Sequence, residues 1–136
     1  MLNTENQPCP QNHTSPILLF SPSPGNTVNY GKRIVDRLMD WGILGEKTLL
    51  GHCIYINGHE MDLIKETNTM VVHNPESNMG NACGCPPTME LVHRGILTGL
   101  GTDGYTHDMT ESYKVANVLH KHHLCDPCLL YTSRCV

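Results

Sequence analysis

Three short apolar segments, each followed by a segment with helical spacing, constrain the fold of this chain more than any other feature. The apolar segments cover residues 48–54, 69–73 and 96–101. The first of these runs is typical of a strand buried on both faces of a sheet, the second is also predicted to be a buried strand, and the third is predicted to be a strand. Strands that alternate with helices form a parallel sheet with right-handed crossover connections. We therefore predict an α/β fold, either as part of a closed barrel or as an open sheet.

Four segments around these strands carry apolar residues at the spacing of a helix. In the first of them, Ile34, Leu38 and Trp41 recur at intervals of three and four residues. Pro87 suits the first turn of a later helix, because its missing N–H needs no partner there. The predicted helices cover residues 30–41, 58–66, 87–94 and 109–122, and the segment 74–86, rich in Asn, Gly and Pro, is predicted to be a loop.

The N-terminal segment and the length of the chain set further limits on the fold. Residues 1–29 are rich in Pro, Ser and Asn and show no apolar period, which favours an irregular segment. A complete (β/α)8 barrel needs roughly 200 residues, whereas this chain has 136. If the strands belong to a barrel, we therefore expect the chain to be a truncated part of it.

Composition argues against several classes of partner. The net charge is −4 and the pI is near 6.1, so we expect no basic surface for nucleic acid or for an anionic membrane. No apolar run approaches the roughly 20 residues needed to span a bilayer, and residues 17–20 are too short an apolar run for a signal peptide. Seven cysteines without framework-like spacing predict reduced thiols in a cytoplasmic protein.

The predicted strand ends carry the side chains most suited to chemistry. His52, His73 and Asp103 lie at or just after the three strands, and ligands of parallel α/β folds bind at that edge. Structural explanations are also open: His52 as a hydrogen-bonded core histidine, and Asp103 as a cap of the loop that follows. A histidine and an aspartate at neighbouring strand ends can hold a metal or move a proton, which favours a functional site.

Three motifs around these residues resemble a known family. In their order along the chain they are similar to the last three strand units of the amidohydrolase superfamily, in the branch of cytosine and guanine deaminases and triazine chlorohydrolases. The resemblance is closest to an aminohydrolase of that branch, and it implies the last three strand–helix units of a (β/α)8 TIM-like barrel. It covers about residues 30–127, leaving 1–29 and 128–136 as non-family segments. The motifs are LLGHCIYI (49–56), HNPESNMGNACGCPP (73–87) and GILTGLGTDGYTHDM (95–109).

The resemblance also implies roles for particular residues. Asp103 matches the aspartate that binds one divalent metal ion, zinc or alternatively iron, and takes a proton from the attacking water. His52 matches a histidine that contacts the reacting water or the substrate and is less often itself a metal ligand. His73, Ser77 and Asn78 match the loop that shapes the substrate pocket. The implied reaction is hydrolysis of a non-peptide carbon–nitrogen bond, the deamination of a small cyclic amidine such as a purine or pyrimidine.

Parts of the family's metal site have no counterpart at the matching positions of this chain. The resemblance places a His-x-His pair on the first strand of the barrel, and a histidine and a general-acid glutamate at the fifth, ahead of Tyr30. We therefore expect the chain to be inactive alone. Whether the complete protein forms a homo-oligomer is left open by the sequence. Two alternative functions remain: a chlorohydrolase of the same fold, and a non-enzymatic Cys/His metal-binding or redox module that uses Cys83 and Cys85.

Overall fold

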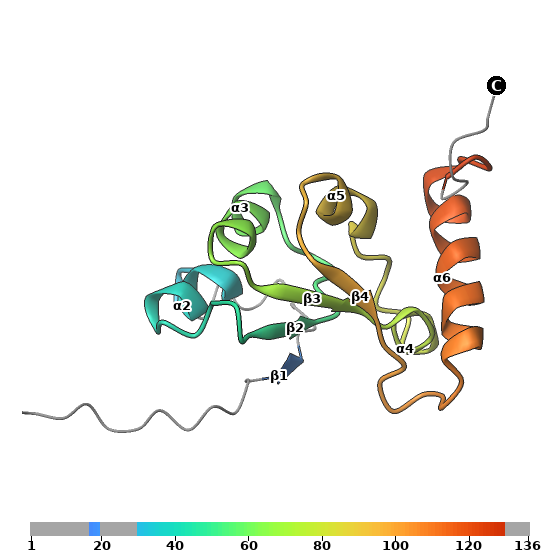
Figure 1. Cartoon of the computed structure of the whole chain (residues 1–136), viewed down its shortest axis with the longest axis horizontal. Coiled ribbons are helices and arrows are strands. Elements are labelled where there is room, and N and C mark those ends of the chain that lie inside the picture. Colours follow the sequence, from blue (N-terminus) through green and yellow to red (C-terminus); the bar gives the residue numbers. More distant parts are fainter. Residues whose placement is uncertain (1–16, 20–29, 130–136) are drawn as a thin grey trace, which may run out of the picture.

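The computed structural model describes residues 17–19 and 30–129, which form a parallel sheet with helices packed against it (Figure 1). The strands lie in the order β1-β2-β3-β4, so successive strands are also neighbours in space. The three strands predicted from the sequence, and their parallel direction, are confirmed. The strand bounds are β1 Ile17–Leu19, β2 Leu49–Gly51, β3 Met70–His73 and β4 Thr98–Leu100.

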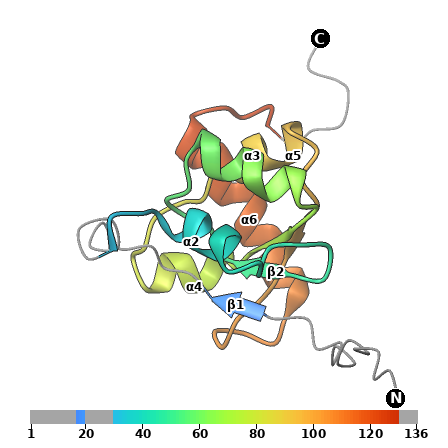
Figure 2. The same ribbon diagram turned by 90° about the vertical axis from the view of Figure 1, so that its left-hand side faces the viewer.

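The helices connect and cover these strands. In Figures 1 and 2, α3 and α5 lie together on one side of the sheet, and β1 lies at its edge. The helix α2 packs against α3, and α4 packs against α6. The four predicted helices are confirmed to within a few residues at their ends. The helix bounds are α2 Ile34–Asp40, α3 Gly58–Glu66, α4 Pro75–Gly80, α5 Thr88–His93 and α6 Met109–Leu124.

Two elements correct the sequence prediction. The irregular segment predicted over residues 1–29 contains β1, which pairs in parallel with β2. This three-residue apolar run is too short to predict a strand within a Pro- and Ser-rich sequence, and β2, with which it pairs, lies far away in the sequence. The loop predicted over residues 74–86 begins with α4. Pro75 stands in the first turn of α4, a position that suits its fixed φ angle, although the Asn- and Gly-rich composition favours a loop.

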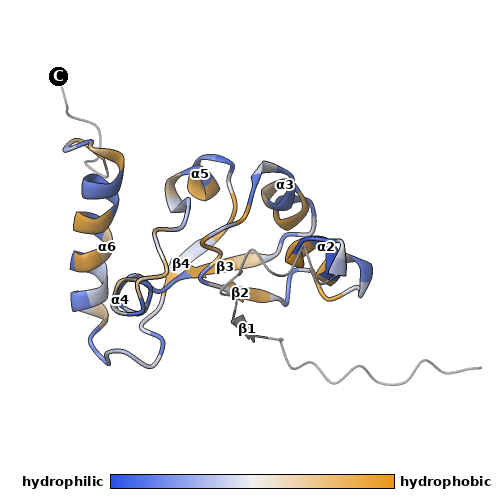
Figure 3. Ribbon diagram, turned by 180° about the vertical axis from the view of Figure 1, so that it is seen from behind, coloured by the Kyte–Doolittle hydropathy of each residue, from blue (hydrophilic) through white to orange (hydrophobic). Residues whose placement is uncertain are grey.

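The hydrophobic core lies between the sheet and the helices. Leu50, Ile64 and Leu91 are fully buried there. In β3, buried and partly covered positions alternate, which puts Val71 and His73 on the buried side. Figure 3 shows apolar residues along β2 and β3, the two central strands of the sheet. The last residue of β3 is therefore a histidine placed in the buried layer.

A buried carboxylate joins α2 to α3. Glu60 is completely buried, yet each of its oxygens has a partner. One oxygen accepts hydrogen bonds from Arg33 Nε at 2.7 Å and from the Asn57 backbone N–H at 3.1 Å. The other accepts a bond from the Val35 backbone N–H at 3.3 Å. Because Asn57 also caps the Glu60 N–H, the start of α3 is fixed by a capping box.

The remaining sequence predictions concern membranes and thiols. Within the described part of the chain, no helix is long and apolar enough to cross a membrane. Cys53, Cys83, Cys85 and Cys125 carry free thiols. The prediction of reduced thiols throughout is wrong for Cys128, which is disulfide-bonded. Cysteine spacing along a chain does not reveal which thiols meet in space.

Candidate functional site

Three polar residues follow three neighbouring strands at the carboxyl edge of the sheet. His52 comes directly after β2, Asn74 directly after β3, and Asp103 shortly after β4. The chain turns sharply at two of these places, since φ is 67° at His52, 47° at Cys53 and 53° at Asp103. Positive φ angles are uncommon outside glycine and cluster at functional sites. The turns bring the side chains of His52 and Asp103 together.

The pair formed by His52 and Asp103 is the centre of the candidate site. His52 Nε2 lies 3.5 Å from Asp103 Oδ2, and the two side chains are 13% and 30% exposed. Ser77 Oγ donates a hydrogen bond to the same oxygen at 2.7 Å, and the Gly104 N–H donates to Oδ1 at 2.8 Å. These two hydrogen bonds lower the pKa of Asp103, Ser77 contributing most. The prediction that His52 and Asp103 meet at one edge of the sheet is confirmed.

The hydrogen bonds of His52 determine which ring nitrogen carries the proton. Nδ1 lies 2.6 Å from Asn78 Oδ1. An amide oxygen only accepts, so Nδ1 must be the N–H donor. In the neutral ring, Nε2 then has a lone pair, and this lone pair faces Asp103, with Asn74 Nδ2 at 3.5 Å. A lone pair and a carboxylate that face each other at this distance suit a bound cation between them.

The three residues predicted to bind substrate lie in two different surroundings. Ser77 and Asn78, both on α4, contact Asp103 and His52 directly. His73 lies behind Asn78, with its Nδ1 3.5 Å from Asn78 Nδ2 and its ring centroid 4.9 Å from that of His120. Burial, together with the charges of His120 and His52, lowers the pKa of His73 to about 3. His73 is therefore a neutral, buried residue next to the site.

Sequence reasoning missed the residues that hold α4 in place. Glu76 Oε2 accepts a buried hydrogen bond from Ser112 Oγ at 2.8 Å, which ties α4 to α6. A Cβ at Gly101 would collide with the side chains of Val72 and Asn74, so this position is kept for glycine by close packing. The Asn- and Gly-rich composition of residues 74–86 indicated an irregular segment there, but it does not predict which partner each side chain contacts.

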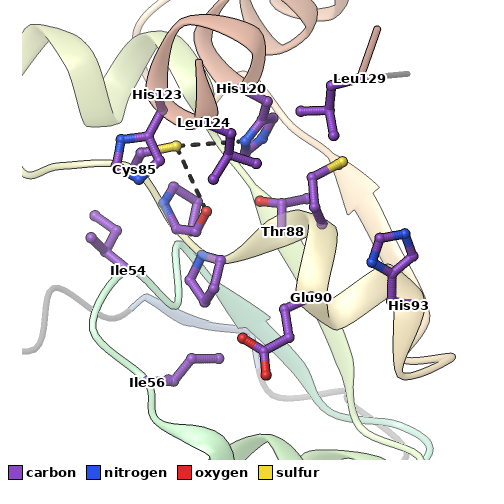
Figure 4. Close-up of a pocket in the computed structure, with 13 residues that line it drawn as sticks. Ile54, Ile56, Cys85, Thr88, Glu90, His93, His120, His123, Leu124 and Leu129 are labelled. Atoms are coloured by element: carbon purple, nitrogen blue, oxygen red, sulfur yellow. Dashed lines mark hydrogen bonds between the residues drawn. The ribbon is translucent and has the colours of Figure 1, made fainter. Parts of the chain in front are cut away.

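A pocket beside α6 lies away from this pair (Figure 4). It has a volume of about 460 Å³ and lies between α5 and the end of α6. Cys85 Sγ lies there, 3.6 Å from His120 Nδ1, and burial raises the pKa of the Cys85 thiol. Neither His52 nor Asp103 lines the pocket. This pocket is thus separate from the pair formed by His52 and Asp103.

The donor atoms of the described residues do not complete a metal site. A catalytic zinc needs about three protein ligands plus water, whereas no three His, Cys, Asp or Glu side chains in residues 30–129 are grouped to hold a metal. His52 and Asp103 offer two. A His-x-His spacing does occur at His120 and His122, but it lies in α6, where residues two apart point in nearly opposite directions. The described residues therefore fit part of a metal site.

Comparison with known proteins places this chain in a family. The model of the amidohydrolase family matches residues 28–132. The chain belongs to the amidohydrolase family. This amidohydrolase chain is 38% identical over 102 residues to a 5'-deoxyadenosine deaminase from Methanopyrus kandleri, covering 72% of the chain and 24% of the relative. It thus spans about a quarter of the length of the curated relatives that it matches.

Solved structures give the same result for the fold of this amidohydrolase chain. An adenosine deaminase from Xanthomonas campestris with bound zinc matches with a TM-score of 0.74 and 25% identity, over 81% of this chain and 27% of that one. A mutant of the atrazine chlorohydrolase TrzN from Arthrobacter aurescens, in complex with zinc and atraton, matches with a TM-score of 0.74 and 16% identity, over 86% and 27%. The second likeness shows the fold alone.

Proposed function

We propose that this chain is part of a metal-dependent hydrolase that removes an amino group from a small ring amidine, such as a purine or pyrimidine. The observation that carries the proposal is the approach of His52 Nε2 to Asp103 Oδ2, 3.5 Å apart at the carboxyl edge of the sheet. The deaminase named among the relatives supports a carbon–nitrogen bond as the target. Residues 30–127 supply the last three strand–helix units of the barrel.

Each residue of the pair has a distinct task in this proposal. A divalent metal, zinc or alternatively iron, supplies when bound a water whose pKa is lowered toward about 7. Asp103 is ionised near neutral pH, as an ordinary aspartate is, and hydrogen bonds from Ser77 and Gly104 lower its pKa further. In this proposal it accepts the proton of the attacking water. His52 presents the Nε2 lone pair on the same side and orients that water. Asn78 and Ser77 fix these two groups and form the neighbouring wall of the substrate pocket.

The rest of the catalytic machinery comes, in this proposal, from parts of the protein outside residues 30–127. These parts provide the remaining metal ligands and the acid that protonates the leaving nitrogen. A chlorohydrolase reaction would use the same pair but expel chloride, and the residues that distinguish the two reactions would also lie in those parts. The Cys/His module is the weaker proposal, because Cys85 meets one histidine and Cys83 only the Asn81 carbonyl oxygen.

A chimera tests the proposal. Residues 30–127 would replace the matching quarter of the Methanopyrus kandleri deaminase, and ammonia release from 5'-deoxyadenosine would be measured. We expect turnover that Asp103→Ala abolishes and that His52→Ala lowers by about 10²–10⁴. His107→Ala, which changes an exposed histidine outside the pair, is the control and should leave the rate unchanged. A folded, zinc-loaded chimera whose turnover does not respond to Asp103→Ala and His52→Ala would refute the proposal, and chloride release from a triazine would favour the chlorohydrolase.

A further inference from the structure

We propose that His73 is a positioning residue for His52, acting through the side-chain amide of Asn78. The inference rests on the proposed function for its catalytic meaning, but its structural basis is separate. Asn78 lies between the two histidines, 2.6 Å from His52 Nδ1 through Oδ1 and 3.5 Å from His73 Nδ1 through Nδ2. Asn78 is 1% exposed, so water does not compete for its amide.

The direction of the two hydrogen bonds that join His73, Asn78 and His52 follows from the donors and acceptors of each group. An amide has one end that accepts and one that donates. The donating end of Asn78 faces His73 Nδ1 at 3.5 Å, so we infer that this nitrogen accepts and that His73 carries its proton on Nε2, a buried atom without a hydrogen-bond partner among the described residues. The accepting end then faces His52, which must carry its proton on Nδ1. A neutral His73 in this form therefore keeps the lone pair of His52 on Nε2, next to Asp103.

The surroundings of His73 keep it neutral and fixed. Its side chain is 1% exposed, and its ring packs at 4.9 Å against His120. His120 is buried too and contacts Cys85, as Figure 4 shows, so it is also held. Burial lowers the pKa of both histidines, to about 3 for His73. His73 Nδ1 thus remains an acceptor throughout the neutral range.

Protonation of His73 would reverse the direction of these hydrogen bonds, and loss of His73 would remove the acceptor that sets it. A charged His73 would carry a proton on Nδ1 and face the donating end of Asn78, which favours rotation of the amide. The rotated amide would offer its N–H groups to His52, so His52 would move its proton to Nε2. The lone pair would then face Asn78 and not Asp103. In this way a residue that lies behind Asn78 sets which nitrogen of His52 is basic.

Nitrogen-15 NMR of the histidine rings tests the inference without any need for turnover. The sample is the 136-residue chain, or the chimera where the chain self-associates. We expect His52 to carry its proton on Nδ1 and His73 on Nε2. His73→Leu, which removes the acceptor, should shift His52 toward the Nε2–H form. His73→Asn can place an oxygen where His73 Nδ1 lies in the native chain, so this variant should restore the Nδ1–H form of His52.

These measurements separate a positioning role from a purely structural one. A structural role predicts that both His73 variants change the urea midpoint without changing the proton position of His52. In the chimera, His73→Leu should lower kcat/KM by about 10- to 100-fold, with partial recovery in His73→Asn. A native His52 with its proton on Nε2, or one that does not respond to His73→Leu, would overturn the inference. If His73→Leu does not fold, the proton positions of His52 and His73 in the native chain still test the inference.

The two proposals fail in different ways. If the chimera has no deaminase activity while His52 responds to His73→Leu, the proposed function is wrong and the positioning relationship stands. If the chimera is active and its activity depends on His52 but not on His73, the proposed function stands and the positioning role of His73 is wrong. His122→Leu, which changes an exposed histidine of α6, is the matched control and should affect neither the ring proton of His52 nor the rate.

Discussion

His52 Nε2 lies 3.5 Å from Asp103 Oδ2, although the two residues follow strands that are not neighbours in the sheet. The strand between them, β3, ends in Asn74 and leads into α4, whose residues Ser77 and Asn78 each hold one member of the pair. The pair is thus assembled across three strand ends. Its geometry depends on α4 as much as on β2 and β4, and this dependence gives testable consequences.

Removal of the Ser77 hydroxyl should change the titration of Asp103. The hydrogen bond from Ser77 is the largest cause of the lowered pKa of Asp103. In Ser77→Ala we therefore expect the pKa of Asp103 to rise toward its ordinary value of 3.8. Carbon-13 NMR titration of the aspartate carboxyl groups measures this directly. In an active chimera, the acid limb of the pH–rate profile should move to higher pH.

Thr102→Ala is the control for that titration. The Thr102 hydroxyl contacts the main-chain oxygen of Asp103 and not its carboxylate. The pKa of Asp103 should therefore stay at its native value in this variant. An Asp103 that titrates identically in Ser77→Ala and in the native chain would show that Ser77 does not stabilise the carboxylate.

Gly101 and Gly99 should respond differently to the same substitution. A Cβ at Gly101 would lie 2.7 Å from Val72 Cγ1 and would collide with the Asn74 amide oxygen, whereas a Cβ at Gly99 meets nothing within 4 Å. We expect Gly101→Ala to lower the free energy of unfolding by about 1–3 kcal/mol. Gly99→Ala should change it by no more than about 0.5 kcal/mol. Urea denaturation measures the free energy of unfolding of both variants. Equal changes in Gly101→Ala and Gly99→Ala would contradict the packing described around Asn74.

Acid should destabilise the fold through its buried histidines. His73 has an ordinary pKa of 6.5, lowered to about 3 by burial first and by neighbouring histidines second. Between these values the unfolded chain binds more protons than the folded chain, so stability is complete above pH 6.5 and falls as the pH drops toward 3. The loss from His73 alone is about 2 kcal/mol at pH 5. Urea midpoints between pH 7 and pH 4.5 measure it.

The variant His73→Asn removes this titrating group and should flatten the pH dependence. His122→Asn changes an exposed histidine and should leave the dependence as it is in the native chain. A native chain whose urea midpoint is constant from pH 7 to pH 4.5 would show that His73 is not held neutral by folding.

The sequence predicted the strand ends of the site but not the network that joins them. His52 and Asp103 were identifiable because a polar residue at the end of an apolar run needs a partner. Ser77 and Asn78 came from the resemblance, and their contacts with the pair came from the structure. The partnership of Glu76 with Ser112 had no local signal, because it joins α4 to α6 across the fold.

The difference between His73 and His52 shows the same limit. Both end apolar strands, so both were candidates for one pocket. The left-handed turn at His52 brings its ring to Asp103, whereas His73 keeps the regular alternation of β3 and points into the buried layer. A sequence pattern gives the position of a residue along a strand. Which face it takes at the strand end depends on backbone angles that the pattern does not encode.

The isolated chain should be inert and prone to self-association. Residues 30–129 provide no group of three metal ligands, so we expect substoichiometric zinc after purification and no release of ammonia from purines or pyrimidines. β4 is the last strand of the described sheet and has one unpaired edge. Exposed strand edges and apolar side chains promote association. Leu97, Tyr113 and Trp41 are 69%, 68% and 60% exposed.

Light scattering, elemental analysis and an ammonia assay on the same preparation test this expectation. Dimers or larger species at micromolar concentration, without bound zinc and without turnover, would agree with it. Addition of the complementary three-quarters of the Methanopyrus kandleri deaminase should then reduce self-association, because it offers β4 a partner strand. A monomeric chain with stoichiometric zinc, and with turnover that Asp103→Ala abolishes, would contradict it. Such a result would mean that this quarter-length chain assembles a working site with ligands from its own residues.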